Sequence, residues 1–330
     1  MLPEIFNQRS SYSALRMNEL RNRLAGLSEL SEFTNLTIFG AGSYARLEAS
    51  EYSDLDVFFL YSGDEKELDK PRTRKLRLFG RVIETVEKMN FPEFSNDCEY
   101  LVVLGTDKIA IHLGSPRDDY ENYFTARMLL LLESTCLYGE ETYQQVIRRV
   151  INSYFKDYHD HPQTFWPTFL LNDICRFWKT LLLNYENRRN LPESADEQKK
   201  TKAKVKNFKL KFSRMTTCFA SIAALGCHRV PVTQEQVVDL TKRTPRQRLE
   251  LVAERAPQAR TAVEDVLKKY AWFLQMTGLS TTQLEEHFSD KQKRTEMFRQ
   301  ANDYGDAMFK LLVSLDETET PPRLLRYLVI

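Results

Sequence analysis

The sequence predicts an α/β N-terminal domain followed by an all-α C-terminal domain. Up to about residue 140, short apolar runs of β-favouring residues alternate with amphipathic segments, a pattern typical of a sheet covered by helices. From Tyr138 onward the apolar spacing is helical almost throughout, and we find no internal repeat. The chain has 330 residues, of which 42% are hydrophobic, so two domains with buried cores are expected. We assign residues 1–140 to the first domain and residues 141–330 to the second.

The first elements are a helix, a strand and a glycine-containing turn. Leucines at helical spacing predict a helix over about residues 12–31, and the apolar run 36–39 predicts the first strand. The turn that follows contains Gly42 and Ser43. Main-chain N–H groups in such a turn can approach an anion without interference from a Cβ atom, so we expect a phosphate-binding turn.

Two aspartates open the second predicted strand. Asp54 and Asp56 begin an apolar run that continues to Tyr61. Side chains two residues apart point to the same face of a strand, so the two carboxylates are expected to project together and to repel each other. A pair of Mg²⁺ ions about 3.5–4 Å apart, for which Mn²⁺ could substitute, neutralises such a pair in polymerase-type sites. The pattern therefore predicts a site for metal ions and a triphosphate.

This pattern resembles the DNA polymerase β-like nucleotidyltransferase superfamily. The segment from Gly42 to Arg46, together with Ser53-Asp54-Leu55-Asp56, is most similar to the minimal nucleotidyltransferases of bacteria and archaea. Those proteins usually carry Gly after the Ala-Arg pair, where this chain has Leu47. The resemblance implies a palm-like nucleotidyltransferase fold for the first domain, with a helical domain completing the cleft for nucleotide and acceptor.

The resemblance also implies a third acidic residue on a neighbouring strand, which completes the metal site and often accepts the proton of the attacking hydroxyl. After an amphipathic helix ending near Asn90, the run 99–104 predicts the next strand. Glu99 at the start of this run and Asp97 two residues earlier both qualify by position, and the choice between them stays open.

Later segments are predicted to be mostly helical. Ser115-Pro116 is typical of a helix start, and we expect that helix to run through Leu132. Residues 188–200 are polar and predict a loop, and the apolar segment 324–330 is expected to dock on the body or on a partner.

A strongly basic helix is predicted in the second domain. The segment from Lys199 to Arg214 holds eight basic residues and no acidic one, and helical spacing places Lys206, Lys209 and Ser213 on one face. Ammonium groups and a hydroxyl suit the phosphates of a nucleotide, and similar residues hold the triphosphate in related helical domains. Tyr44, beside Ser43, is a candidate for stacking on the base.

The amino-acid composition indicates how the protein could bind phosphate and in which compartment it is expected. The chain has 47 basic and 46 acidic side chains, so any affinity for phosphate comes from local clusters. Its five cysteines include no Cys-x-x-Cys pair, which favours a reducing cytoplasm, and we expect neither secretion nor a membrane span. The oligomeric state is not predicted.

The predicted reaction transfers a nucleoside monophosphate from an NTP, such as ATP, or a dNTP to a hydroxyl and releases pyrophosphate. We expect a nucleotide or single-stranded oligonucleotide acceptor, as in the untemplated and signal-producing enzymes of bacterial antiphage defence that the two-domain layout resembles. The alternatives are transfer to a protein, a tRNA or a small molecule, or a non-catalytic nucleotide sensor.

Overall fold

A computed structural model describes residues 3–63, 72–92, 101–189, 196–316 and 324–329. The chain divides into two compact units. The sheet unit consists of residues 7–161 and 233–244, and the helical unit consists of residues 1–6, 162–232 and 245–330. The sheet unit therefore continues past residue 140, where the sequence-based division lay, and also takes in one later helix.

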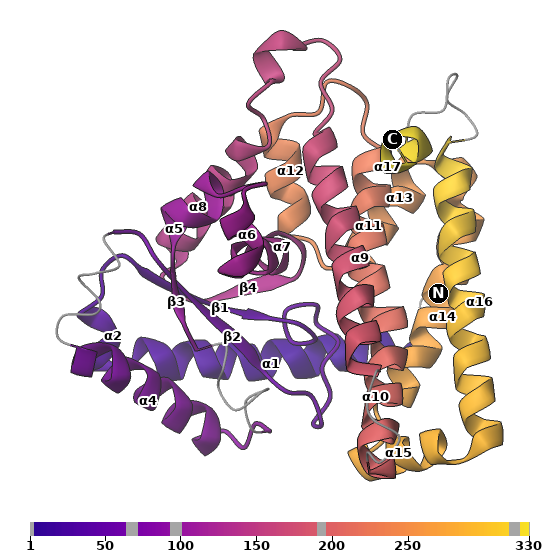
Figure 1. Ribbon diagram of the computed structural model, residues 1–330, viewed down its shortest axis with the longest axis horizontal. Coiled ribbons are helices and arrows are strands. Elements are labelled where there is room, and N and C mark those ends of the chain that lie inside the picture. The colour runs from indigo at the N-terminus through magenta and orange to yellow at the C-terminus, as the bar shows by residue number, and fades with distance from the viewer. Residues whose placement is uncertain (1–2, 64–71, 93–100, 190–195, 317–323, 330) are drawn as a thin grey trace. The chain divides into compact units, whose positions relative to one another are not determined.

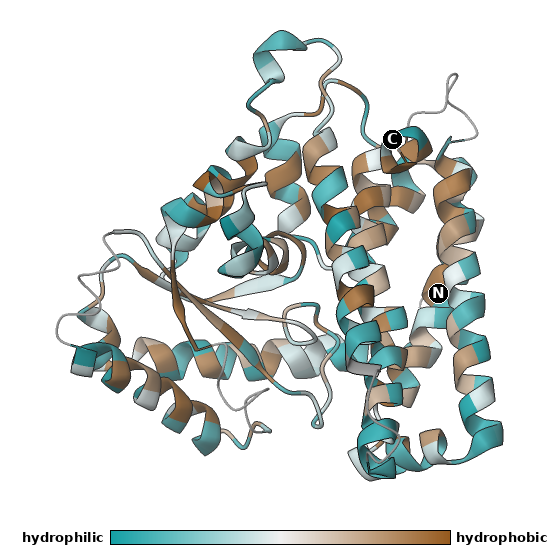
Figure 2. Ribbon diagram, viewed as in Figure 1, coloured by the Kyte–Doolittle hydropathy of each residue, from teal (hydrophilic) through white to brown (hydrophobic). Residues whose placement is uncertain are grey.

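The sheet unit is built around a four-stranded mixed sheet in the order β3-β2-β1-β4 (Figure 1). The central strands β1 (Leu36–Ala41) and β2 (Asp56–Tyr61) are antiparallel, as are β1 and β4 (Ser134–Tyr138), whereas β2 and β3 (Val103–Gly105) are parallel. Figure 2 shows that the central strands are largely hydrophobic. Such strands are expected in a sheet that is covered on both faces.

Helices cover the two faces of the sheet. The helices α1 (Ile5–Ala25) and α4 (Arg72–Lys88) lie on one face, and α7 (Tyr123–Leu132) and α8 (Glu140–Ser153) contact β1 on the other (Figure 1). Side chains of α1, α4 and the strands form one buried cluster that includes Leu20, Leu55 and Val82. Val57 of β2 and the preceding Leu55 lie in this cluster, so alternation directs Asp56 between them to the opposite face.

Several sequence predictions are confirmed, and some boundaries differ. The predicted helix over residues 12–31 is present as α1 and the short α2 (Ser28–Ser31), and α4 ends close to Asn90 as expected. The expected long helix from Ser115 to Leu132 is instead α6 (Pro116–Tyr120) and α7, separated by Asn122 in the left-handed region at φ 59°. β4 was not predicted at all, and the unit also contains α5 (Thr106–Ile111), the short η1 (Tyr158–Asp160) and α12 (Gln234–Thr241).

The helical unit contains only helices and connections among its described residues, as predicted. Its helices are α9 (Thr168–Arg189), α10 (Glu197–Lys209), η2 (Leu210–Arg214), α11 (Met215–Gly226), α13 (Pro245–Arg255), η3 (Pro257–Ala259), α14 (Arg260–Met276), α15 (Thr281–Ser289), α16 (Lys291–Asp316) and α17 (Leu324–Val329). Aromatic rings fill its core, with Phe212 stacked on both Phe273 and Tyr304 at centroid distances of 4.8 and 4.6 Å. None of the described helices has both the length and the apolar character needed to cross a bilayer.

The C-terminal helix α17 docks on the helical unit, as the apolar sequence predicted. It contacts α9 and α16, and Leu324 is buried. A Cβ added to Gly226 would lie 2.8 Å from a methyl carbon of Leu324, so the two residues are in close contact. The Asp316 carboxylate accepts the backbone N–H of Leu324 at 2.9 Å and so caps the helix.

Candidate nucleotide and metal site

The turn predicted at Gly42 and Ser43 follows β1 directly and is closed by backbone hydrogen bonds. The N–H of Arg46 donates to the Gly42 carbonyl at 3.0 Å, and the N–H of Glu48 donates to the Ser43 carbonyl at 2.8 Å. The N–H groups of Ser43 and Tyr44 make no backbone hydrogen bond to another described residue. Two successive N–H groups of this kind are suited to receive an anion.

Gly42 brings this turn next to a carboxylate. The strand register pairs Ala41 with Asp56, so Gly42 lies beside the first residue of β2. Gly42 has φ 75°, and a Cβ added to it would lie 3.1 Å from Asp56 Oδ2. Both the backbone conformation and the adjacent oxygen therefore favour glycine here. The predicted phosphate-binding turn and one predicted metal ligand are adjacent in the structure.

Asp54 and Asp56 flank a buried leucine. Leu55 is 1% exposed in the core on the α1 face, whereas Asp54 is exposed and Asp56 is partly exposed. Only Asp56 belongs to β2, because Asp54 precedes the strand. Both aspartates therefore lie outside the core that buries Leu55.

The donor set of this site fits a hard cation. Carboxylate oxygens are ligands that Mg²⁺ and Mn²⁺ accept, and Asp54 and Asp56 supply them next to the turn predicted to bind phosphate. No cluster of three or more acidic, histidine or cysteine side chains suited to a metal occurs in the described part of the chain. Glu99 and Asp97, the two candidates for the third carboxylate, lie outside the described residues.

The structure corrects the prediction for Tyr44. Its side chain is 1% exposed and belongs to the core, where its ring meets that of Phe91 edge-on at a centroid distance of 5.2 Å. Burial also raises the pKa of its hydroxyl. A ring enclosed in this way cannot stack on a base. Tyr44 instead anchors the turn to the hydrophobic core.

The other predicted phosphate ligands belong to the helical unit. Lys206 and Lys209 are exposed on α10, as the helical spacing predicted. Ser213 lies in the π-helical turn η2, is 8% exposed, and donates its hydroxyl hydrogen bond to the Lys209 carbonyl at 2.8 Å. The lysine side chains are thus open to solvent, whereas the serine hydroxyl already has an acceptor within the helix.

Sequence reasoning missed a buried group of charges beside the turn. Arg46 donates from Nε to Glu48 Oε2 at 2.7 Å and from Nη1 to Glu133 Oε2 at 2.6 Å. Arg46 was noticed only as part of the resemblance to related proteins. Its pairing with Glu133 depends on β4, the strand that the sequence did not predict.

Comparison with known families identifies a domain in this part of the chain. Residues 20–102 match the family model described as a nucleotidyltransferase domain. The matched segment includes β1, the turn at Gly42 and Ser43, both aspartates and β2. Comparisons with curated proteins and with solved structures gave no match.

Proposed function

Because the chain contains a nucleotidyltransferase domain of the polymerase β-like superfamily, we propose that it transfers a nucleoside monophosphate from an NTP or dNTP to a hydroxyl, releasing pyrophosphate. One observation carries this proposal. The turn at Gly42 approaches Asp56 so closely that an added Cβ would lie 3.1 Å from its carboxylate oxygen. This proximity supports a site in which the N–H groups of the turn bind phosphate and the neighbouring carboxylate binds a metal ion.

The residues have separate roles in this proposal. Asp54 and Asp56 hold the metal ions, with Glu99 or Asp97 as the further acidic residue, and the turn at Gly42 and Ser43 receives the triphosphate through its N–H groups. When bound, Mg²⁺ supplies the positive charge that lowers the pKa of the acceptor hydroxyl and stabilises the leaving pyrophosphate.

In this proposal the basic helix α10 also binds phosphate. The exposed ammonium groups of Lys206 and Lys209 act as point charges for phosphate oxygens. Ser213 joins them only if its hydroxyl exchanges the Lys209 carbonyl for a phosphate oxygen. Lys206 and Lys209 are therefore the stronger candidates.

We favour a nucleotide or single-stranded oligonucleotide as the acceptor, as in the untemplated synthases of antiphage defence. The support is the basic segment from Lys199 to Arg214, whose lysines at positions 202, 206 and 209 are exposed. Rows of lysines bind phosphate backbones by releasing counterions, and that binding weakens as salt increases. Transfer to a protein, a tRNA or a small molecule is the alternative acceptor class.

Incubation with labelled triphosphates tests the function and the acceptor together. The purified protein is mixed with Mg²⁺ and each labelled NTP or dNTP in turn, and the products are separated by size. We expect labelled oligomers or cyclic products. Label on the protein itself would instead support protein nucleotidylation. Absence of labelled product, even after addition of oligonucleotides, tRNA and cell extract, would contradict nucleotidyl transfer and favour a nucleotide sensor.

A further inference from the structure

The turn that carries Gly42 and Ser43 is bordered by buried charges of alternating sign. The Arg46, Glu48 and Glu133 side chains are 6%, 5% and 0% exposed, and their two ion pairs have N–O distances of 2.7 and 2.6 Å. Arg9, which is 7% exposed on α1, continues the row. Burial lowers the pKa of Arg9, and the negative charge of Glu48 opposes that shift. Two cations and two anions thus neutralise one another inside the sheet unit.

This charge row joins both ends of the turn to the sheet. Arg46 and Glu48 lie at the far end of the turn, whereas Glu133 immediately precedes Ser134 in β4. Ser134 is the Cα partner of Ala41, the residue just before Gly42. The Arg46–Glu133 pair therefore ties the end of the turn to the strand that flanks its start.

The backbone of the turn needs such support. Leu47 has φ 60° between the two residues that form the ion pairs, although it has a Cβ and is not glycine. A left-handed conformation costs an L-residue about 1–2 kcal/mol, and it persists where the surrounding contacts fix it. Arg46 precedes Leu47 and Glu48 follows it, and the ion pairs of these two residues are contacts of this kind.

Arg46 is not placed to bind phosphate itself. Its guanidinium group is almost fully buried, and Nε and Nη1 already donate to carboxylates. Buried ion pairs are weak sources of net stability, because the cost of desolvation offsets most of their attraction. Their benefit here is a fixed backbone conformation at a functional turn.

We propose that Arg46 is a positioning residue which, through Glu48 and Glu133, holds the turn at Gly42 and Ser43 in the conformation that receives the triphosphate. This inference rests on the proposed nucleotidyl transfer. In this proposal, charged residues from three segments of the chain hold the backbone of the turn in its binding conformation before the triphosphate binds.

Two variants test this role. Arg46→Lys keeps the positive charge but loses the planar fork that reaches two carboxylates. The double variant Arg46→Met with Glu133→Gln removes one charge of each sign and leaves Glu48 next to Arg9, so it avoids an uncompensated buried carboxylate. The matched control is Arg81→Lys, because Arg81 also pairs with two carboxylates, Glu29 and Glu84, but is 47% exposed on α4.

Hydrogen exchange gives a readout that does not depend on catalysis. The amides of Arg46, Leu47 and Glu48 donate within the turn. We expect them to exchange at least tenfold faster in both Arg46 variants and at the wild-type rate in Arg81→Lys. Exchange at the wild-type rate in both Arg46 variants would overturn the proposal.

Steady-state kinetics separate positioning from loss of folded protein. A misplaced turn binds the triphosphate more weakly, so KM for the Mg²⁺–triphosphate complex should rise at least tenfold. A protein that is only destabilised loses active molecules, which lowers the apparent kcat and leaves KM unchanged. An unchanged KM in both Arg46 variants would therefore overturn the positioning role. If the wild type turned over no triphosphate, the proposed function would fail, while hydrogen exchange would still decide whether Arg46 fixes the turn.

Discussion

Leu47 stands where minimal nucleotidyltransferases usually have glycine, and its φ of 60° explains the preference for glycine. The position needs a left-handed backbone, which glycine adopts without steric cost. Leu47 is partly buried, so the side chain contributes some packing in return. The resemblance revealed this departure, but only the backbone conformation shows its physical cost.

Replacing Leu47 should reverse the usual ranking of alanine and glycine. Leu47→Ala removes the side chain and keeps the strain, whereas Leu47→Gly removes both, so we expect the glycine variant to be more stable by about 1 kcal/mol. Urea unfolding of both variants measures this difference. Leu15, which is 67% exposed in α1, provides the control. There Ala should be the more stable by about 1 kcal/mol, and the same order at position 47 would contradict strain at that site.

His228 gives the helical unit a pH-dependent stability. Burial, together with the charge of the neighbouring Arg255 guanidinium 2.9 Å away, lowers the pKa of His228 from 6.5 to about 4. Between these two values the unfolded chain binds a proton that the folded chain does not. Stability should therefore decrease as the pH falls from 6.5 towards 4.

The variant His228→Gln tests this pH dependence. Its unfolding temperature should change less than that of the wild type between pH 6.5 and 4, since the titrating ring is gone. An unchanged pH slope in His228→Gln would rule out His228 as the source.

At the scale of elements, the central strands could be predicted and the edge strand β4 could not. The apolar run 36–39, the turn after it and the strand entered at Asp56 are local patterns, and all three are present. β4 follows α7 directly and has only five residues. It is a strand because it pairs with β1, which lies about a hundred residues earlier in the sequence. The local sequence pattern does not indicate a pairing over that distance.

In the candidate site, too, the features that lie in one short segment could be predicted, and those that depend on contacts between distant segments could not. Gly42, Asp54 and Asp56 could be proposed from the sequence because they lie in one short segment with a recognisable pattern. The burial of Tyr44 and the pairing of Arg46 with Glu133 depend on packing between distant segments. Sequence spacing could place Tyr44 near the turn but not decide which way its ring points.

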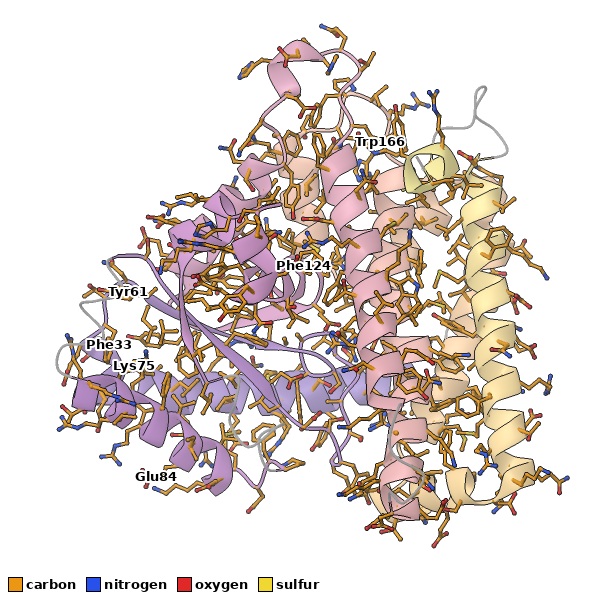
Figure 3. The ribbon with its side chains drawn as sticks, viewed as in Figure 1. Phe33, Tyr61, Lys75, Glu84, Phe124 and Trp166 are labelled. Atoms are coloured by element: carbon orange, nitrogen blue, oxygen red, sulfur yellow. The ribbon has the colours of Figure 1, made fainter. Side chains whose placement is uncertain are left out.

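Another buried ion pair joins the helices on one face of the sheet. Arg127 of α7 forms two hydrogen bonds with the Asp118 carboxylate of α6, at 2.8 and 2.6 Å, and a third with the Tyr154 hydroxyl at 2.8 Å. Both charged side chains are 0% exposed. The Arg127 guanidinium also lies 5.7 Å from the ring centroid of Phe124, which Figure 3 labels.

Neutralising Asp118 should strongly destabilise the sheet unit. Asp118→Asn leaves the Arg127 charge buried without its counter-charge, and we expect a loss of about 3–5 kcal/mol in the free energy of unfolding. Denaturant titration checks this value. The control Asp239→Asn, whose carboxylate is 64% exposed, should change stability by less than about 0.5 kcal/mol. Equal effects of the two variants would contradict the role of the buried pair.

At the scale of the whole molecule, each of the two units is built from segments that are not continuous in sequence. The chain leaves the sheet unit after residue 161, returns to it for residues 233–244, and leaves again. The returning segment contains α12, which packs on α8 and buries Val237, Val238 and Leu240. Helical periodicity predicted a helix-rich region here, but the spacing alone could not assign α12 to the earlier unit.

A truncated sheet unit tests this assignment. Residues 7–161 alone would expose the surface of α8 that α12 covers, whereas addition of residues 233–244 through a flexible Gly/Ser linker should restore that cover and raise the unfolding temperature. The same fusion carrying Val238→Asp should lose the gain, because Val238 is 1% exposed. Equal unfolding temperatures with and without the added segment would contradict the assignment.

The central claim is that the turn at Gly42 and the aspartates after it form a nucleotidyl-transfer site. The most direct measurement is the rate of pyrophosphate release from the preferred triphosphate in the presence of Mg²⁺, for the wild type, Asp56→Asn and the exposed control Asp239→Asn. We predict release by the wild type and the control, and background release by Asp56→Asn with an unchanged fold, because the metal loses a carboxylate ligand. Pyrophosphate release at the wild-type rate by Asp56→Asn would contradict the claim.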